Sequence, residues 1–90
     1  MKKILAIQGS DLKNINIKTD TTILLAAEAQ KRGYSIYYFE PENLSFLNGK
    51  IIASCKHIKI HDNKKKFYSS IKAINFNLEK SNVILIRNDP

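Results

Sequence analysis

The order of elements in the first 40 residues constrains the fold of this chain more than any other feature. A continuous apolar run, Ile4–Ile7, ends at the turn signal Gln8–Ser10, which is typical of a strand buried on both faces of a sheet. A helix is predicted over Thr21–Arg32, and a strand rich in β-forming residues follows over Tyr34–Phe39. Strand, helix and strand in this order form a βαβ unit with parallel strands and a right-handed crossover. The sequence therefore predicts an α/β fold class with a partly parallel sheet.

The predicted helix carries signals at both of its ends. Asp20 is a suitable N-cap, because its carboxylate can accept hydrogen bonds from the free amides of the first turn. Lys31 and Arg32 lie in the last turn, where positive charge is favourable to the helix dipole, and Gly33 can adopt the positive φ of a C′ residue. The stripe expected to face the sheet consists of Ile23, Ala26, Ala27 and Gln30, with Leu24 and Leu25 beside it.

After the βαβ unit the pattern becomes that of an added β-hairpin. Asn48–Gly49, the strongest short hairpin signal, lies between the apolar stretch Leu44–Leu47 and the alternating stretch Lys50–Ile60. The segment Phe67–Asn77 stays open between helix and strand, because its spacing is helical whereas several of its residues favour strands. A last continuous apolar run, Asn82–Arg87, predicts a second buried parallel strand.

The length of the chain allows one domain, residues 1–90, with a modest core. One helix cannot cover both faces of a sheet of several strands. The chain stops at Pro90, three residues after the last predicted strand. We therefore expect the sheet to be completed by more protein, from a missing domain or from a partner.

The net charge of +7 raises the question of nucleic-acid binding. Lysine, asparagine and isoleucine supply 36 of the 90 residues, and A- and T-rich codons favour all three together. Only two of the fifteen basic residues are arginine, the usual bidentate reader of bases and phosphates. Compositional drift and a solvated surface explain the charge better than a nucleic-acid partner, which we do not predict.

Cysteine usage and hydropathy indicate a cytoplasmic protein. Cys55 has no second cysteine to pair with, which excludes a secreted disulfide scaffold. The apolar run near the N-terminus is too short for the core of a signal peptide, and no stretch approaches the roughly 20 apolar residues that span a membrane. No membrane association is predicted.

Candidate binding residues gather where ligands bind in open α/β sheets, at the carboxyl ends of the strands. Asn14, Asn16 and Lys18 follow the first strand, although asparagines in a loop also satisfy turn geometry. Asp20 and Thr21 lie at a helix N-terminus, a natural anion site, but capping alone explains both residue types.

Arg87 is the strongest candidate. It ends an apolar strand, where a long cationic side chain needs a partner. Its guanidinium could bind a substrate carboxylate through two parallel hydrogen bonds. The alternative is an internal salt bridge with Asp89 or Glu40.

No catalytic or metal-binding residue is predicted. Cys55 and His57 share a strand face, but we expect the hairpin to lie far from the ligand end of the sheet, which favours simple packing. His57, His61 and Asp62 match no tight zinc pattern. Gly9 stands alone where a dinucleotide fingerprint needs three glycines.

Three segments resemble, in order and spacing, the N-terminal domain of prokaryotic glutathione synthetases. Asn14–Thr22 is similar to the family stretch N-I-N-I-K-x-D-[ST]-[ST], and Glu28–Tyr34, soon followed by Tyr38–Glu40, to the helix end E-A-Q-x-R-G-Y. Val83–Pro90 is similar to a strand that ends in R-K-D-P-P-F-D. The resemblance covers the whole chain with two departures: Asn88 replaces the usual lysine, and the chain ends at the first proline of the last motif.

The resemblance implies a Rossmann-like pre-ATP-grasp domain that forms one wall of a substrate cleft and contributes to a homo-oligomer interface. The full enzyme joins γ-glutamylcysteine to glycine after ATP phosphorylates the cysteinyl carboxylate. Its central and ATP-grasp domains hold ATP and Mg²⁺, so this chain alone is predicted to hold no cofactor and to be inactive. The implied partners are γ-glutamylcysteine or glutathione and the remaining domains of the synthetase. A stand-alone Rossmann-like module that binds a small molecule or an anion is the alternative.

Overall fold

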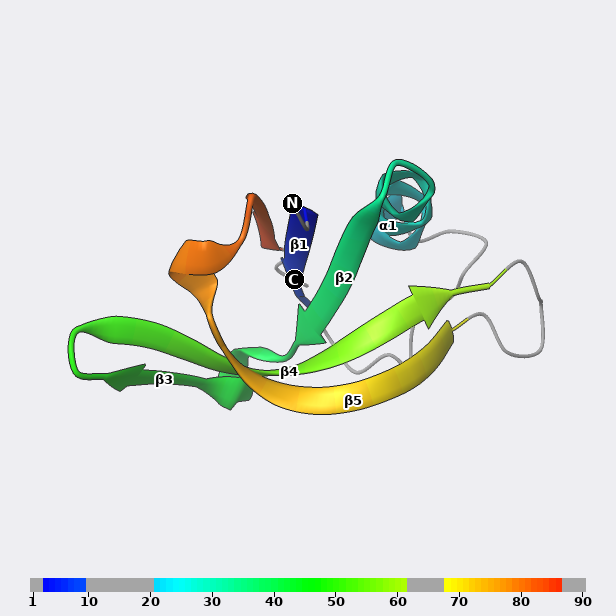
Figure 1. Cartoon of the computed structure of the whole chain (residues 1–90). Helices are drawn as coiled ribbons and strands as arrows, with labels where there is room; N and C mark the ends of the chain where they lie inside the picture. The colour runs from blue at the N-terminus through cyan, green and yellow to red at the C-terminus, as the bar shows by residue number, and fades with distance from the viewer. Residues whose placement is uncertain (1–2, 10–20, 62–67, 87–90) are drawn as a thin grey trace.

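The computed structural model describes residues 3–9, 21–61 and 68–86, which form one mixed α/β domain with a six-stranded sheet. Figure 1 shows the helix on one side of the parallel strands and a long antiparallel ribbon that curves beneath them. In chain order the elements are β1 (Lys3–Gln8), α1 (Thr21–Lys31), β2 (Tyr34–Phe39), the 3₁₀-helix η2 (Pro41–Asn43), β3 (Leu44–Leu47), β4 (Lys50–Ile60), β5 (Tyr68–Asn77), the 3₁₀-helix η3 (Leu78–Lys80) and β6 (Val83–Ile86).

The parallel part of the sheet is built around β1. This strand pairs in parallel with β2 on one side, Lys3 opposite Tyr34, and with β6 on the other, Leu5 opposite Val83. The predicted βαβ unit is therefore present, with the predicted bounds of its second strand. Its helix ends as predicted, since Gly33 adopts a φ of +93°.

The antiparallel part is built around β4. This strand has 11 residues, so one of its sides has room for two shorter strands, β3 and β2. Along that side β4 pairs first with β3, through Leu47 and Lys50, and then with β2. The predicted hairpin turn is confirmed: Asn48 and Gly49 both have positive φ, 52° and 76°. Positive φ at both central residues is the requirement of a type I′ turn, which matches the twist of the two strands.

Within the open segment, Tyr68–Asn77 forms a strand, and Phe67 lies outside the described residues. β5 pairs with β4 over nearly its whole length, from Ile52 opposite Asn77 to Ile60 opposite Tyr68, with one irregularity next to His57. The strand is favoured over a helix for two reasons. In the strand conformation Phe76 is buried against the sheet, and the backbone forms a ladder of hydrogen bonds with β4.

Two hydrophobic clusters lie on opposite faces of the sheet. The helix-side face, defined here as the face that α1 covers, buries one cluster, and the opposite face buries the second, to which η3 and the end of β5 contribute. On the helix side the buried residues are Leu5, Ile7, Ile23, Ala26, Ile36, Tyr38, Ile58 and Ile60. On the opposite face they are Ala6, Phe39, Ala53, Cys55, Phe76 and Leu78.

The expectation that the last apolar run is buried is wrong. β6 is parallel to β1 as predicted, but Val83, Ile84 and Ile86 are 45%, 44% and 61% exposed. The reason is its place in the sheet. Within the described residues β6 pairs with β1 alone, so its outer edge and part of both faces lie at the surface.

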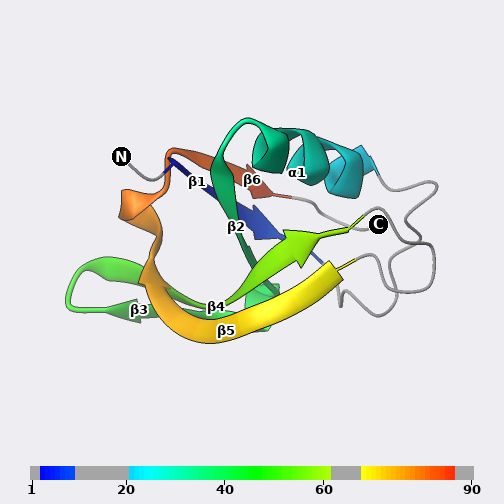
Figure 2. The same ribbon diagram turned by 45° about the vertical axis from the view of Figure 1, so that its right-hand side comes forward.

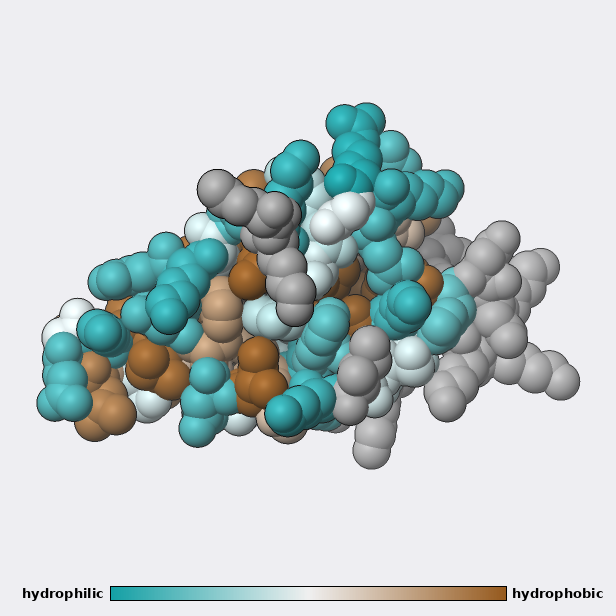
Figure 3. All heavy atoms as spheres, in the orientation of Figure 1, coloured by the Kyte–Doolittle hydropathy of each residue, from teal (hydrophilic) through white to brown (hydrophobic). Residues whose placement is uncertain are grey.

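A second exposed apolar surface is the arm formed by β3 and the start of β4. Figure 3 shows hydrophobic side chains gathered on this arm, at the left of the view. Its exposed members are Leu44, Phe46, Leu47 and Ile51. The helix also exposes Leu24 and Leu25, each by 57%, beside the stripe that it buries.

Candidate functional site

The carboxyl ends of the parallel strands meet at one edge of the sheet. Gln8 at the end of β1 lies opposite both Phe39 in β2 and Ile86 in β6. Figure 2 shows β1 and β6 pointing to the same side of the molecule, the side on which α1 begins. The chain leaves β1 for β2 in one direction and later returns to β6 on the other side, so the switch point lies between β1 and β6. In open α/β sheets ligands bind outside the carboxyl ends of the strands at such a point.

Of the predicted binding residues, Thr21 falls within the described part of the chain. It is the exposed first residue of α1, at the carboxyl edge of the parallel strands. Asn14, Asn16, Lys18, Asp20 and Arg87 lie outside the described residues. In the sequence the first four fall between β1 and α1, and Arg87 follows the last residue of β6.

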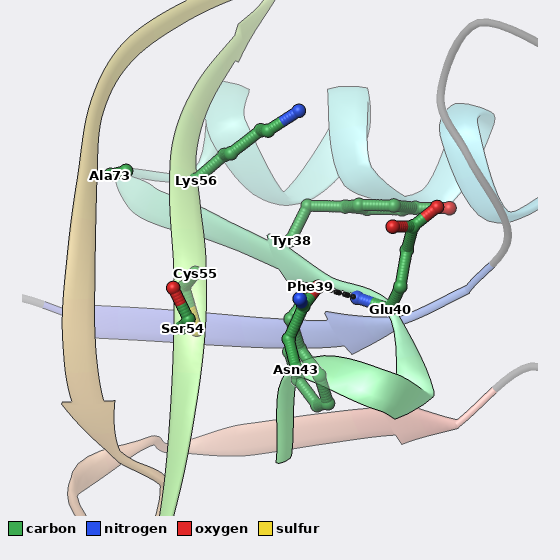
Figure 4. Close-up of a pocket in the computed structure, with 8 residues that line it drawn as sticks. All are labelled: Tyr38, Phe39, Glu40, Asn43, Ser54, Cys55, Lys56 and Ala73. Atoms are coloured by element: carbon green, nitrogen blue, oxygen red, sulfur yellow. Dashed lines mark hydrogen bonds between the residues drawn. The ribbon is translucent and has the colours of Figure 1, made fainter.

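A hollow of about 290 Å³ beside the end of β2 was not predicted from the sequence (Figure 4). It forms because β4 pairs with β3 through residues 50–53 and with β2 through residues 56–58, while residues 40–43 leave the sheet between the two pairings. The interruption Glu40–Pro41 between two stretches of β-forming residues was the available sequence signal. The lining residues are Tyr38, Phe39, Glu40, Asn43, Ser54, Cys55, Lys56 and Ala73.

The side chains at the mouth of this hollow are held by the turn of η2. The amide of Glu40 donates to Asn43 Oδ1 at 3.0 Å, and the Asn43 amide donates to the Glu40 carbonyl oxygen at 2.9 Å. These two hydrogen bonds fix the turn that begins at Glu40. Lys56 contributes an ammonium group from the neighbouring strand (Figure 4). The hollow thus combines a carboxylate, from Glu40, and a cation, from Lys56, next to the ligand edge.

Gly9 has a packing role, which explains why a single glycine stands at this position without a dinucleotide-binding fingerprint. Its amide donates to the carbonyl oxygen of Phe39 at 3.0 Å, which brings the end of β1 against the end of β2. A Cβ atom at this position would collide with the Tyr38 hydroxyl. The glycine is therefore required by the close approach of the Tyr38 ring, which is 3% exposed.

Cys55 lies closer to the ligand edge than predicted. It lines the hollow beside Phe39, because β4 runs past the end of β2, so the expectation of a distant hairpin is wrong. Burial raises the pKa of its thiol from 9.0 to about 11, the opposite of what a nucleophile needs. His57 shares its face but packs edge-on against Tyr37, with ring centroids 5.1 Å apart. Cys55 itself is fully buried in the hydrophobic cluster on the face opposite α1.

Residues 3–9, 21–61 and 68–86 hold no group of three or more His, Cys, Asp or Glu side chains placed to bind a metal ion. In the same ranges no helix combines the length and the apolar character needed to cross a membrane.

The segment Glu28–Tyr34, one of the three that carry the family resemblance, has a structural explanation. Gln30 joins α1 to the end of β4 through two hydrogen bonds: its Nε2 donates to the Ile60 carbonyl oxygen at 3.0 Å, and its Oε1 accepts from the Ile60 amide at 2.8 Å. Arg32 forms an ion pair with Glu28 at 3.2 Å, one turn earlier. The motif thus ends the helix and fixes it to the antiparallel part of the sheet.

Comparison with known proteins decides the family. The model of the prokaryotic glutathione synthetase N-terminal domain matches residues 3–90. This chain belongs to that family. Glutathione synthetase of Mesorhizobium japonicum is 32% identical over 90 residues, which are 100% of this chain and 29% of the relative. The enzymes of Wigglesworthia glossinidia brevipalpis and Escherichia coli K12 are 37% and 34% identical over 86 residues, 96% of this chain and 27% of each relative.

The family match confirms the resemblance found in the sequence and bears on the fold. The chain spans less than a third of the length of these synthetases. It covers the N-terminal domain of the family, and its partly parallel α/β sheet is consistent with a pre-ATP-grasp domain.

Proposed function

We propose that this chain is the N-terminal, substrate-side domain of a cytoplasmic glutathione synthetase, which joins γ-glutamylcysteine to glycine. The observation that carries the proposal is the family match over residues 3–90. The carboxyl edge of β1, β2 and β6 then forms one wall of the substrate cleft. The switch point between β1 and β6 supports this assignment, because it is the position at which open α/β sheets bind ligands.

The proposed binding residues follow the strands that end at this edge. Arg87 comes directly after β6, and its guanidinium would hold a carboxylate of γ-glutamylcysteine in bidentate fashion. Asn14, Asn16 and Lys18 would line the cleft from the segment after β1. Asp20 and Thr21 would offer the amides of the helix N-terminus to an anionic group.

Catalysis requires the rest of the synthetase in this proposal. ATP and Mg²⁺ would be held by the central and ATP-grasp domains, where the cysteinyl carboxylate is phosphorylated before the glycine amine attacks. One wall of a cleft offers too few contacts to offset the lost freedom of a small polar peptide, so the chain alone would bind γ-glutamylcysteine or glutathione weakly or not at all. The assembled enzyme would be a homo-oligomer, with this domain contributing to the contacts.

A chimera tests the proposal most directly. This chain would replace the 86-residue matched stretch of the E. coli K12 synthetase, and ATP-dependent formation of glutathione from γ-glutamylcysteine and glycine would be measured. We expect activity from the chimera and none from the 90-residue chain. A chimera that folds and assembles like the E. coli enzyme, yet forms no glutathione, contradicts the proposal.

The role of Arg87 is tested within the same chimera. Arg87→Ala should raise the KM for γ-glutamylcysteine by about tenfold or more, as expected when a charge-assisted bidentate pair is lost. Arg32→Ala is the matched control, because it removes the other arginine, whose side chain is exposed and paired with Glu28 on α1. Equal KM values for the two variants would show that Arg87 does not bind γ-glutamylcysteine.

Ligand binding by the free chain distinguishes a stand-alone binding module from a domain that needs the rest of the synthetase. The hollow of about 290 Å³ beside the end of β2 is the feature that favours it. Micromolar binding of γ-glutamylcysteine or glutathione to the 90-residue chain, with no other domain present, would support this alternative.

A further inference from the structure

The hollow beside the end of β2 is a feature that the proposed substrate cleft does not use. Cys55 belongs to the buried cluster on the face opposite α1, so its neighbours Ser54 and Lys56 point to the other face, because side chains alternate along a strand. Lys56 lies opposite Tyr38 in β2 and opposite Ala73 in β5. These three residues form a row across three strands, and the row lines the hollow.

The side chains of β4 change from apolar to polar where the hollow begins. Ile58 and Ile60 belong to the cluster that α1 helps to bury, and they are 1% and 8% exposed. Lys56 and Ser54 are the next two positions on the same face, and both are polar and exposed. A surface that another protein covers is usually apolar, whereas a concave polar surface suits water or a small polar ligand.

Small side chains keep the hollow open. Ala73 and Ser54 line it from β5 and β4, where larger side chains would fill the space. The turn of residues 40–43 forms the wall on the side of β2. The volume of about 290 Å³ is close to the lower limit of ligand pockets, so a ligand that fits must be small.

The side chain of Asn43 has a fixed orientation in this wall. Its Oδ1 accepts a hydrogen bond from the Glu40 amide at 3.0 Å, so its Nδ2 points the other way. Figure 4 shows this nitrogen on the side of β4, from which Ser54 offers a hydroxyl and Lys56 an ammonium group. All three groups are hydrogen-bond donors that line one hollow, and together they suit a carboxylate.

The hollow also contains a negative charge that a simple anion would leave without a partner. Glu40 supplies the one carboxylate among the described lining residues, so a metal ion would find too few ligands. Within the described part of the chain, neither Glu40 nor Lys56 takes part in an ion pair. The two opposite charges therefore line the same hollow without direct contact, and a small ligand that carries both charges can bind both residues.

We infer that the hollow beside β2 is a binding site for a free α-amino acid. The carboxylate of the ligand binds Lys56, Asn43 and Ser54, and its ammonium group binds Glu40. This site lies apart from the switch point between β1 and β6, and the inference does not depend on the proposed function.

The experiment is an NMR titration of the isotope-labelled 90-residue chain with L-alanine. Propionate and ethylamine are the matched controls, because the first lacks the ammonium group of L-alanine and the second lacks its carboxylate. L-Alanine should shift the amide signals of Asn43, Ser54 and Lys56 with a millimolar dissociation constant, and those of Thr21 and β6 should stay unchanged. Each control ligand should bind at least about tenfold more weakly, since it loses one charge-assisted interaction.

Matched variants assign the two charges. Lys56→Met and Glu40→Gln should each weaken the binding of L-alanine by at least about tenfold. Lys59→Met is the control for the first, because Lys59 is an exposed lysine of the same strand, and Glu42→Gln is the control for the second, because Glu42 is an exposed carboxylate of the same turn. Both controls should change the affinity by less than about twofold.

The response of each variant to the control ligands tests the orientation of the bound amino acid. Lys56→Met should not weaken the binding of ethylamine, and Glu40→Gln should not weaken the binding of propionate, because each ligand lacks the group that the altered residue binds. Ala73→Leu retains both charges but fills the hollow, so it should abolish the binding of L-alanine.

The titration of the unaltered chain keeps the inference testable if a variant fails to fold. Three results overturn it: no shift of the three amides at tens of millimolar L-alanine, equal affinities for propionate and L-alanine, or shifts centred on Thr21 and β6, at the proposed cleft. Equal losses of affinity in Lys56→Met and Lys59→Met overturn it as well. Activity of the chimera is a separate readout, so this inference and the proposed function can each fail alone.

Discussion

β1, in the parallel part of the sheet (β1, β2 and β6), and β3, in the antiparallel part (β3, β4 and β5), bury similar side chains to different extents. Leu5, Ala6 and Ile7 are consecutive in β1 and all are at most 5% exposed, so β1 is covered on both faces. All four residues of β3 are exposed, including Phe46 at 74%. β3 is as rich in apolar side chains as β1, so composition does not explain the difference.

The difference lies in the neighbours of each strand. β1 is flanked by two strands, with α1 on one face and the cluster around Phe39 and Phe76 on the other. β3 pairs with β4 through four residues at the end of a projecting arm (Figure 1). A hairpin forms locally, whereas burial requires other elements to arrive, and β6 shows the same dependence at the parallel edge.

The largest expected effect contrasts a core position with the arm. Ile36→Ala in β2, where the side chain is 1% exposed, should lower the free energy of unfolding by about 2–5 kcal/mol, because a cavity replaces buried methyl groups. Phe46→Ala in β3 should change it by no more than about 0.5 kcal/mol. Urea unfolding measures both. Comparable losses would show that the arm is packed in solution and would break the contrast.

The next prediction concerns Cys55, which is fully buried although it belongs to the antiparallel part. Burial raises its pKa from 9.0 to about 11 in the folded chain. Between these values the unfolded thiol ionises while the folded thiol stays protonated, so stability is unaffected below pH 9 and falls as the pH rises toward 11. Between pH 9 and 11 the unaltered chain should lose on the order of 2 kcal/mol of its free energy of unfolding through this thiol. Cys55→Ala, which has no thiol, should not show that loss.

The measurement is the urea midpoint of both proteins at several pH values from 8 to 11. Tyrosine and lysine titrate in both proteins, so the difference between the two curves isolates the thiol. Parallel curves would mean that the thiol is solvated and that β4 is not covered at this point.

A smaller effect is expected where α1 is joined to the antiparallel part of the sheet. Gln30→Ala removes both hydrogen bonds to the Ile60 backbone and should destabilise the chain by about 1–2 kcal/mol. The amide of Ile60 should also exchange faster with solvent, which NMR can follow. Lys31→Ala is the control, since Lys31 is the exposed neighbour in the same helix. Equal effects of the two variants would show that the hydrogen bonds of Gln30 to β4 do not stabilise the chain.

The smallest effect is expected on the helix surface. Glu28→Gln removes an ion pair whose Arg32 and Glu28 side chains are 73% and 55% exposed. The loss should not exceed about 0.5 kcal/mol and should shrink in high salt. Thermal unfolding at two ionic strengths measures it. A larger, salt-independent loss would instead show that the Glu28 side chain stabilises the fold by packing.

Local signals were sufficient for the elements that depend on a few neighbouring residues. Gly33 and Asn48–Gly49 adopt the positive φ values that their residue types favour, so the helix end and the hairpin turn were predictable. Tyr68–Asn77 was not predictable as a strand, because its residue propensities conflict and pairing with β4 determines its conformation. The exposure of β6 was missed because an apolar run does not reveal its place in a sheet.

The candidate site was likewise predictable from the sequence only in part. The sequence placed Asn14, Asn16 and Lys18 after the first strand and Arg87 after the last. Pairing then brought the ends of those two strands to one edge, with Gln8 opposite Ile86. The hollow beside Glu40 had no local signal strong enough to predict it, since it exists only because β4 passes both β2 and β3.

Short stretches of sequence were enough to predict the βαβ unit, the hairpin turn and membership of the glutathione synthetase family. These features depend on periodicity, turn chemistry and motifs that span a few residues each. Only the tertiary structure decided the strand order, the burial of Cys55, the hollow beside β2 and the exposed edge of β6. Each of these depends on contacts such as Leu5 with Val83, between residues at opposite ends of the chain. Such pairings are selected by the shared burial of many side chains, which no single segment encodes.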